Sequence, residues 1–410
     1  MRSAKYPPMG WNSWDCYGTA VNEAIVRQNA DYMASHLKPF GWEYVVVDIQ
    51  WYQPTADTHD YIPFAECCMD EWGRMIPAPN RFPSGFRALA DYVHGLGLKF
   101  GIHIMRGVPR MAAHRRLPIH GSEYTCADAA DPNSICMWNP DMYGARSRHS
   151  AALAYYQSIF RLYAEWGVDF VKCDDIAREY PHCEREIELI SEACRTCGRD
   201  IVLSLSPGPA PVERAEHLKT YANMWRITDD FWDDWRLLKA MFERAEKWCI
   251  HSGPGHWPDA DMLPVGALRQ NTDPSYWTKF TQAEQRTMMT LWCMMRSPLM
   301  IGGEMTKFDD FTLSLLTNAA LLEIEKATHC AHPLYTTDEA SAWIAPRVDG
   351  KGVYAALFNL SDKAQTLELN AQQLGLPAIR EATELWSEKK QKKLKVRLAA
   401  HGAAVWLVKF

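Results

Sequence analysis

The sequence has no excess of basic residues and no long apolar run, and these two absences exclude several classes of protein. Its 410 residues include 44 Lys and Arg against 50 Asp and Glu, a net charge of −6, whereas nucleic-acid-binding proteins normally carry a basic excess or stripe. The one basic cluster, at 389–395, is expected to be a solvated hairpin loop. No run approaches the roughly 18 apolar residues of a membrane span, and residues 1–8 lack a signal core. We therefore expect a cytoplasmic protein that binds neither nucleic acid nor membrane.

Signatures of metal, cofactor and disulfide chemistry are also missing. No Gly-rich phosphate or dinucleotide loop follows the first predicted strand. His251 and His256 flank a Gly-Pro-Gly turn, but no HExxH or comparable ligand set accompanies them. The 12 cysteines are scattered through a long chain, which favours reduced, buried thiols, and the CxxC at 194–197 has no partner pair. We expect no metal and no cofactor.

The pattern along the chain alternates between strands and helices. Strand-like runs lie at 42–48, 99–104, 168–174, 201–206, 221–228 and 298–303, and amphipathic stretches lie at 21–37, 85–96, 148–166 and 231–250. This alternation predicts a parallel sheet. About eight such units over roughly 300 residues favour a (β/α)8 TIM barrel over a doubly wound sheet.

Two segments depart from this alternation. From residue 329 onward the sequence contains only short strand-like runs with polar turns, which predicts an antiparallel β-sandwich. We therefore expect a catalytic barrel at 1–328 and a C-terminal all-β domain at 329–410. Residues 106–144 show weak periodicity and several prolines. A loop of this length is usually functional, so we expect it to overhang the barrel mouth and shape a pocket.

Polar residues recur where the predicted strands end, which is the face of a TIM barrel that carries the active site. Asp174 ends the fourth strand, and Asp230 lies just past the sixth. Two strands separated by one other can place a carboxyl pair at the roughly 5 to 5.5 Å used by retaining glycosidases. Lys172 points to the same face as Asp174 and would keep it ionised; a purely structural ion pair is the alternative.

Tryptophans strengthen a sugar-binding interpretation, because a pyranose ring presents an apolar C–H face that stacks on an indole. Seven lie near predicted strand ends or the long loop: Trp11, Trp14, Trp51, Trp138, Trp225, Trp232 and Trp257. Core packing is the alternative for any one of them.

Five motifs, in order along the predicted barrel, resemble glycoside hydrolase family 27, the family of α-galactosidases and α-N-acetylgalactosaminidases. They are Met9-Gly10-Trp11-Asn12-Ser13-Trp14, Val47-Asp48-Ile49-Gln50-Trp51, Phe170-Val171-Lys172-Cys173-Asp174, Trp225-Arg226 with Asp230, and the stretch from Gly253 to Leu263. The trailing β domain also fits this family.

The resemblance implies roles for individual residues. Asp174 matches the family's nucleophile and Asp230 its acid/base, with Asp229 and Asp233 as weaker candidates. The other matching positions would bind the sugar: Trp14 by stacking, Asp48, Lys172 and Arg226 at hydroxyls, Asp261 in the same pocket, and His103 where the family often has tyrosine. We expect an oligosaccharide or small glycoside as substrate, while the oligomeric state stays open.

Two departures from the family pattern concern the choice of sugar. The family usually carries two adjacent aspartates that bind O4 and O6 of galactose, but here the pair is Asp48-Ile49. A lost hydrogen bond to O6 costs about 1 to 3 kcal/mol, or roughly 5- to 150-fold in discrimination. L-arabinopyranose is galactose without C6, and its β-L-glycoside superimposes on the α-D-galactoside. We therefore expect Ile49 to favour β-L-arabinopyranosides.

Three other interpretations compete with this one. An α-D-galactosidase would need another residue to hold O6. An α-N-acetylgalactosaminidase is suggested by Ser206, a small residue where many α-galactosidases have glutamate, although Pro207-Gly208 replaces the family's usual following residues. An inactive carbohydrate-binding protein would be expected to lose one carboxylate of the pair, and both are present.

Overall fold

Eight parallel strands curl into a barrel in the computed structural model, which describes residues 4–62, 64–272 and 274–410. In chain order they are β1 (Met9–Asn12), β2 (Tyr44–Val47), β3 (Lys99–Met105), β7 (Phe170–Asp174), β8 (Val202–Leu205), β9 (Met224–Arg226), β10 (Trp257–Asp259) and β13 (Leu299–Ile301). Each pairs with the next from β1 to β10, and β13 pairs with β1. A parallel bridge between Leu263 and Ile301 joins the remaining edges. The predicted TIM barrel is confirmed.

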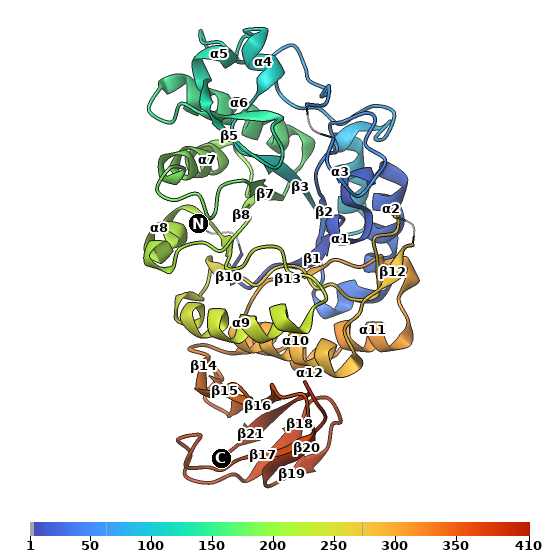
Figure 1. Cartoon of the computed structure of the whole chain (residues 1–410), viewed down its shortest axis with the longest axis vertical. Helices are drawn as coiled ribbons and strands as arrows, with labels where there is room; N and C mark the ends of the chain where they lie inside the picture. Colours follow the sequence, from blue (N-terminus) through green and yellow to red (C-terminus); the bar gives the residue numbers. More distant parts are fainter. Residues whose placement is uncertain (1–3, 63, 273) are drawn as a thin grey trace.

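Helices pack around the outside of these strands (Figure 1). The main ones are α2 (Glu23–Tyr32), α3 (Gly85–Gly95), α6 (Ser150–Trp166), α7 (Glu184–Thr196), α8 (Ala215–Tyr221), α9 (Trp235–Trp248), α10 (Gln282–Met295) and α11 (Asp310–Leu316). Shorter elements are α1 (Trp14–Tyr17), β11 (Ala267–Leu268), β12 (Tyr276–Trp277), α12 (Ala319–Leu322) and α13 (Ile324–Ala327). In α9, Leu238, Met241, Phe242, Ala245 and Trp248 are buried, which is the apolar stripe expected of a helix that covers a barrel. Within the described ranges, no helix has the length and apolar character needed to cross a membrane.

The segment after β3 is more ordered than its sequence indicated. It contains β4 (Val108–Pro109), α4 (Arg110–His114), α5 (Cys126–Ala129), β5 (Ala130–Ile135) and β6 (Met142–Ala145). The three strands form a small sheet in the order β4-β6-β5. The expectation of an irregular loop at 106–144 was wrong, because elements of two to six residues are too short to show a period.

The C-terminal part is an antiparallel β-sandwich, as predicted. One sheet has the order β14 (His332–Thr336), β15 (Ala340–Pro346), β16 (Val353–Asn359), β21 (Ala403–Lys409), β18 (Glu381–Glu384) and β19 (Lys390–Gln391). The other pairs β17 (Gln365–Leu369) with β20 (Leu394–Leu398). Leu357 and Trp406 of the first sheet share one apolar cluster with Leu369 and Leu394 of the second.

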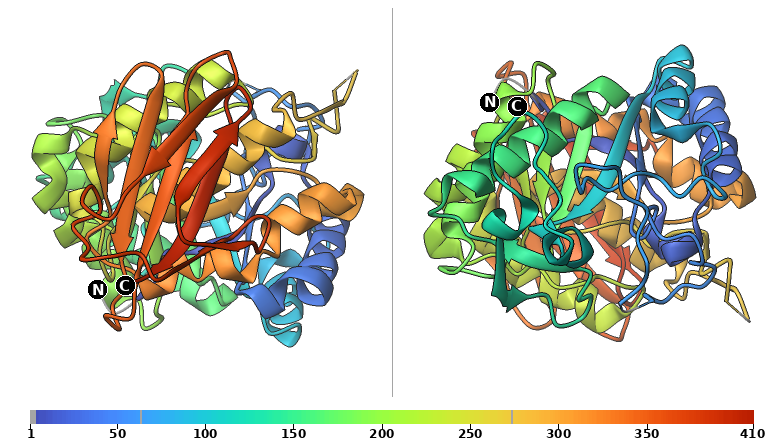
Figure 2. Two further views of the ribbon diagram at one scale, coloured as in Figure 1. Left: turned by 90° about the horizontal axis from the view of Figure 1, so that it is seen from below. Right: turned by 90° about the horizontal axis from the view of Figure 1, so that it is seen from above.

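This sandwich lies against the barrel on the side of α9 and α10, and its orange and red strands stand in front in the left view of Figure 2. Thr287 of α10 donates a hydrogen bond to the His401 carbonyl at 2.6 Å. The last barrel helix ends at Ala327 and β14 begins at His332; the boundary at 328/329 stays a prediction. The basic cluster at 389–395 is solvated, but part of it forms β19 rather than a loop.

Candidate active site

A cavity of about 230 Å3 opens where the barrel strands end. It is lined by Trp14, Asp15, Asp48, Tyr61, Trp138, Lys172, Asp174, Arg178, Pro207, Arg226, Asp229, Asp230, Phe231, Trp232, Asp261 and Met262. These residues come from α1, β7, the end of β9 and the loops that follow β2, β7, β8, β9 and β10, with Trp138 from the segment after β3. The volume lies below the roughly 300 to 1,000 Å3 of pockets for drug-sized ligands. The cavity therefore suits a single sugar ring.

Asp174 is buried at the end of β7 and is held by hydrogen-bond donors on both oxygens. His103 Nε2 lies 2.9 Å from Oδ2, and the Asp175 backbone N–H donates to Oδ1 at 2.9 Å. Burial alone would raise the pKa of Asp174, but the hydrogen bond from His103 and the charge of Lys172 hold it well below its ordinary value. Asp174 is therefore a carboxylate at neutral pH.

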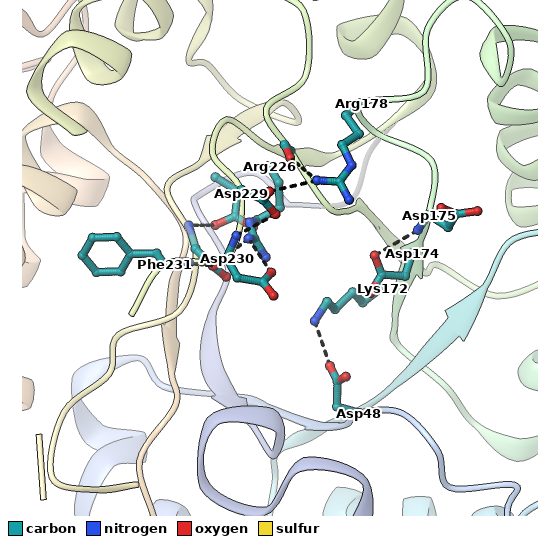
Figure 3. A network of polar contacts seen from close by, with 12 residues as sticks. Asp48, Lys172, Asp174, Asp175, Arg178, Arg226, Asp229, Asp230 and Phe231 are labelled. Atoms are coloured by element: carbon teal, nitrogen blue, oxygen red, sulfur yellow. Dashed lines mark hydrogen bonds and ion pairs between the residues drawn. The ribbon is translucent and has the colours of Figure 1, made fainter. Parts of the chain in front are cut away.

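Lys172 and Asp48 form a buried ion pair beside Asp174 (Figure 3). Lys172 Nζ lies 2.9 Å from Asp48 Oδ2, with the side chains 13% and 2% exposed. Asn12 donates to the same oxygen at 2.8 Å, and the Ile49 backbone N–H donates to the other at 2.9 Å. Burial raises the pKa of Asp48, but the charge of Lys172, the nearby His103 and the hydrogen bonds from Lys172 and Asn12 together lower it overall. Both groups are charged and fixed in place.

On the opposite side of the cavity, Arg226 connects two aspartates. Its Nη2 lies 2.6 Å from Asp261 Oδ2 and 3.2 Å from Asp230 Oδ1. Arg226 and Asp261 are each 4% exposed in their side chains, whereas the Asp230 side chain is 58% exposed. Burial and the charge of Asp230 raise the pKa of Asp261 to about 7 despite Arg226. Asp230 is thus a solvent-exposed carboxyl of the cavity lining that is paired with Arg226.

The two weaker acid/base candidates are differently placed. Asp229 lines the cavity, but its Oδ2 is paired with Arg178 Nη1 at 3.0 Å. Asp233 is buried and accepts a hydrogen bond from the Lys279 backbone at 2.7 Å. Of the three carboxyls, Asp230 is the one that pairs with Arg226, which also holds Asp261.

Three predicted sugar ligands do not line the cavity. Ile49 is 1% exposed and belongs to the apolar core, whereas Asp48 before it lines the cavity. His103 is fully buried and reaches the site only through Asp174. Ser206 is 1% exposed, and its hydroxyl has no hydrogen-bond partner within the described ranges.

The seven tryptophans divide into two groups. Trp14, Trp138 and Trp232 line the cavity, as the sugar-binding interpretation predicts. The other four, Trp11, Trp51, Trp225 and Trp257, are 0 to 1% exposed and pack inside the protein. For these four the core-packing alternative is correct.

Sequence reasoning missed four residues that line the cavity, Asp15, Tyr61, Arg178 and Phe231. Asp15 is 1% exposed, and one of its oxygens has no hydrogen-bond partner among the described residues. Burial and the nearby charge of Asp261 raise the pKa of Asp15 well above its ordinary value. Tyr61 comes from the connection at 48–84, whose length after a strand end was a usable signal. Its ring stacks on Trp14 with centroids 5.1 Å apart and 17° between the planes.

The arrangement provides two carboxyl groups with different environments. Asp174 is buried, ionised and hydrogen-bonded, which suits a nucleophile, while Asp230 is solvent-facing, which suits exchange of a proton with a leaving group or water. Charged donors and acceptors around them can bind several sugar hydroxyls.

Comparison with known proteins agrees with this chemistry. The family model described as alpha galactosidase A matches residues 6–143 and 141–327, and the alpha galactosidase C-terminal beta sandwich domain matches residues 337–408. An α-galactosidase from Coffea arabica is 29% identical over 399 residues, covering 96% of this chain and 90% of its own length.

Two solved structures are more similar. A GH27 β-L-arabinopyranosidase from Geobacillus stearothermophilus is 50% identical, with a TM-score of 0.96 and coverage of 99% of this chain and 97% of its own. A variant of that enzyme was solved in complex with arabinose. A Bacillus halodurans protein provisionally assigned as an α-N-acetylgalactosaminidase is also 50% identical, with a TM-score of 0.89 and coverage of 100% and 98%. The chain belongs to glycoside hydrolase family 27, the α-galactosidase family.

Proposed function

We propose that the protein is a retaining exo-glycosidase that releases terminal β-L-arabinopyranose. The observation that carries this proposal is the Asp48-Ile49 pair, in which no carboxylate follows the expected O4 ligand. The Geobacillus arabinopyranosidase, 50% identical over nearly the whole chain, supports it. The small cavity volume supports recognition of one terminal sugar.

In the proposed first step, Asp174 attacks the anomeric carbon while Asp230 protonates the departing oxygen. The C1–O bond breaks, the aglycone leaves as an alcohol, and the sugar becomes an ester of Asp174. In the second step Asp230 takes a proton from water, which attacks C1 and releases Asp174 as a carboxylate. The low pKa of Asp174 supports the nucleophile assignment, because it is ionised without help from a base. The exposure of Asp230 at the mouth supports the acid/base assignment.

The other predicted residues would position the sugar. Asp48 and Lys172 would bind the O4 side, since their ion pair fixes an acceptor and a donor at one end of the cavity. Arg226 and Asp261 would bind the O2 and O3 side, and Trp14 would stack on the ring. His103 would act by holding Asp174.

Two alternative substrates have specific support. The matching family model and the Coffea relative favour an α-D-galactoside. Ser206 and the Bacillus halodurans relative favour an N-acetyl-α-D-galactosaminide. Ser206, however, is buried and does not line the cavity. The room that its small side chain would give to an acetamido group is therefore not part of the cavity.

Initial rates with three nitrophenyl glycosides distinguish these substrates: the β-L-arabinopyranoside, the α-D-galactoside and the N-acetyl-α-D-galactosaminide. We expect kcat/KM to be highest for the arabinopyranoside, by roughly 5- to 150-fold over the galactoside. A galactoside value equal to or above the arabinopyranoside value would contradict the proposed sugar. That result would not change the family assignment or the roles proposed for Asp174 and Asp230.

A further inference from the structure

Hydrogen bonds fix the segment at 58–62 on both sides of Tyr61. Thr19 Oγ1 lies 2.9 Å from the carbonyl oxygens of both Thr58 and Asp60. On the other side, the Ile62 backbone N–H donates to Gln50 Oε1 at 3.3 Å. Gln50 is itself fixed, because its Nε2 donates to Asp141 at 2.7 Å. The position of Tyr61 is therefore set by hydrogen bonds to the barrel end and to the segment after β3.

Aromatic contacts hold the Tyr61 ring in the cavity wall. It stacks on Trp14 at 5.1 Å and lies against Trp138 at 5.0 Å, with 47° between those two planes. All three residues line the same cavity. Aromatic pairs at such distances stabilise each other beyond the burial of their surfaces. The ring is thus a packed part of the wall.

The charges around Tyr61 indicate which edge of the sugar it faces. Burial and the negative charges of Asp174, Asp48 and Asp230 raise the pKa of Tyr61 well above its ordinary value, and all three carboxylates line the cavity with it. In the proposed binding mode Asp174 lies at C1, Asp230 at the leaving oxygen and Asp48 at O4. C1 and C4 are joined on one side of the ring by C5 and O5, and on the other by C2 and C3. Arg226 and Asp261 face the second side, which leaves Tyr61 on the C5–O5 edge.

We propose that Tyr61 is a specificity-determining residue that fills the space a substituent on C5 would occupy. This inference rests on the proposed function and deepens it, because it assigns the preference for pentopyranosides to exclusion by size. It differs from the role expected of Ile49, which would only withhold a hydrogen bond from O6 and whose side chain is buried in the core. The ligand class is then a pyranoside with an unsubstituted C5.

An α-D-fucoside separates the two effects, since it is the α-D-galactoside without O6 and so carries a methyl group on C5. For the unmodified protein we expect kcat/KM for the fucoside to fall about 10-fold or more below that for the β-L-arabinopyranoside. Tyr61→Ala should raise the fucoside-to-arabinopyranoside ratio by about 10-fold, and Tyr61→Phe should leave it unchanged because the ring remains. Phe64→Ala is the matched control, since this aromatic residue of the same connection is 72% exposed and does not line the cavity.

Three results would overturn the inference. The unmodified protein could hydrolyse the fucoside as well as the arabinopyranoside, which requires no variant to fold and would show that C5 substituents are not excluded. Tyr61→Ala could lower kcat/KM for both sugars by the same factor, which would show a structural role. If the folded, unmodified protein hydrolysed neither of these two sugars nor the α-D-galactoside, the proposed function would fall as well.

Discussion

Replacing Lys172 by methionine removes one charge from the buried ion pair with Asp48. The two side chains are 13% and 2% exposed, and their charged atoms lie 2.9 Å apart. Breaking a buried pair leaves an uncompensated charge and typically costs about 3 to 5 kcal/mol. Asn12 and the Ile49 N–H still donate to Asp48, so we expect a loss near the lower end of that range. Chemical denaturation followed by tryptophan fluorescence measures it.

Two control variants isolate the contribution of the buried ion pair to stability. Lys247→Met breaks a surface ion pair at 2.6 Å whose side chains are 57% and 75% exposed, and we expect a change within about 0.5 kcal/mol. The double variant Asp48→Asn with Lys172→Met removes both buried charges, so stability should recover while activity does not. Equal effects of Lys172→Met and Lys247→Met on the denaturation midpoint would refute the reasoning.

The same variant tests the link to catalysis. Lys172 lowers the pKa of Asp174, so its loss raises that pKa and moves the acid limb of the kcat/KM profile to higher pH. The loss of a charged hydrogen bond to the sugar, worth about 1.5 to 3 kcal/mol, should also reduce kcat/KM at neutral pH by roughly 10- to 150-fold. An unchanged acid limb together with unchanged kcat/KM would leave Lys172 with a structural role only.

Three further predictions concern single positions. Asp174→Gly should abolish turnover of the arabinopyranoside, with partial recovery in azide, and an unimpaired variant would remove Asp174 from the mechanism. Ile49→Asp puts a carboxylate, which is costly to bury, at a 1% exposed position next to Asp48, so it should lower the denaturation midpoint and, by turning toward the sugar, raise the galactoside-to-arabinopyranoside ratio of kcat/KM; a ratio that stays constant or falls would contradict the role assigned to this position. Glu325 is fully buried, and burial raises its pKa well above the ordinary value despite the nearby charge of Arg296. Stability linked to its protonated form is lost as pH rises through that raised pKa, so Glu325→Gln should flatten the decline of the denaturation midpoint with rising pH; parallel declines would show that Glu325 does not titrate there.

The barrel and the carboxyl pair were predictable because they depend on short-range patterns. The strand at 168–174 and the helix at 148–166 that precedes it can be recognised from local periodicity. Polar residues at strand ends converge in a barrel whatever the loops do, so Asp174 and Asp230 could be placed on the same face from their positions alone.

The residues of the cavity wall were less predictable. Whether a side chain faces the cavity or the core depends on the tertiary structure around it, which the local sequence does not encode. Trp51 and Trp138 both lie near predicted strand ends or loops, yet one is buried in the core and the other lines the cavity. Ile49 directly follows a cavity residue but is buried in the apolar core and does not line the cavity. Tyr61 reaches the cavity through hydrogen bonds that Thr19 and Gln50 make to its neighbours, which no spacing rule predicts.

Covalent trapping tests most directly the claim that Asp174 forms a glycosyl ester with an arabinopyranosyl sugar. A 2-deoxy-2,2-difluoro-β-L-arabinopyranoside with a good leaving group should inactivate the enzyme and add one sugar to its intact mass. Peptide mapping should then locate the label on the peptide that contains Asp174. A label on Asp230 instead, or release of the inverted anomer from the unmodified substrate, would contradict the account.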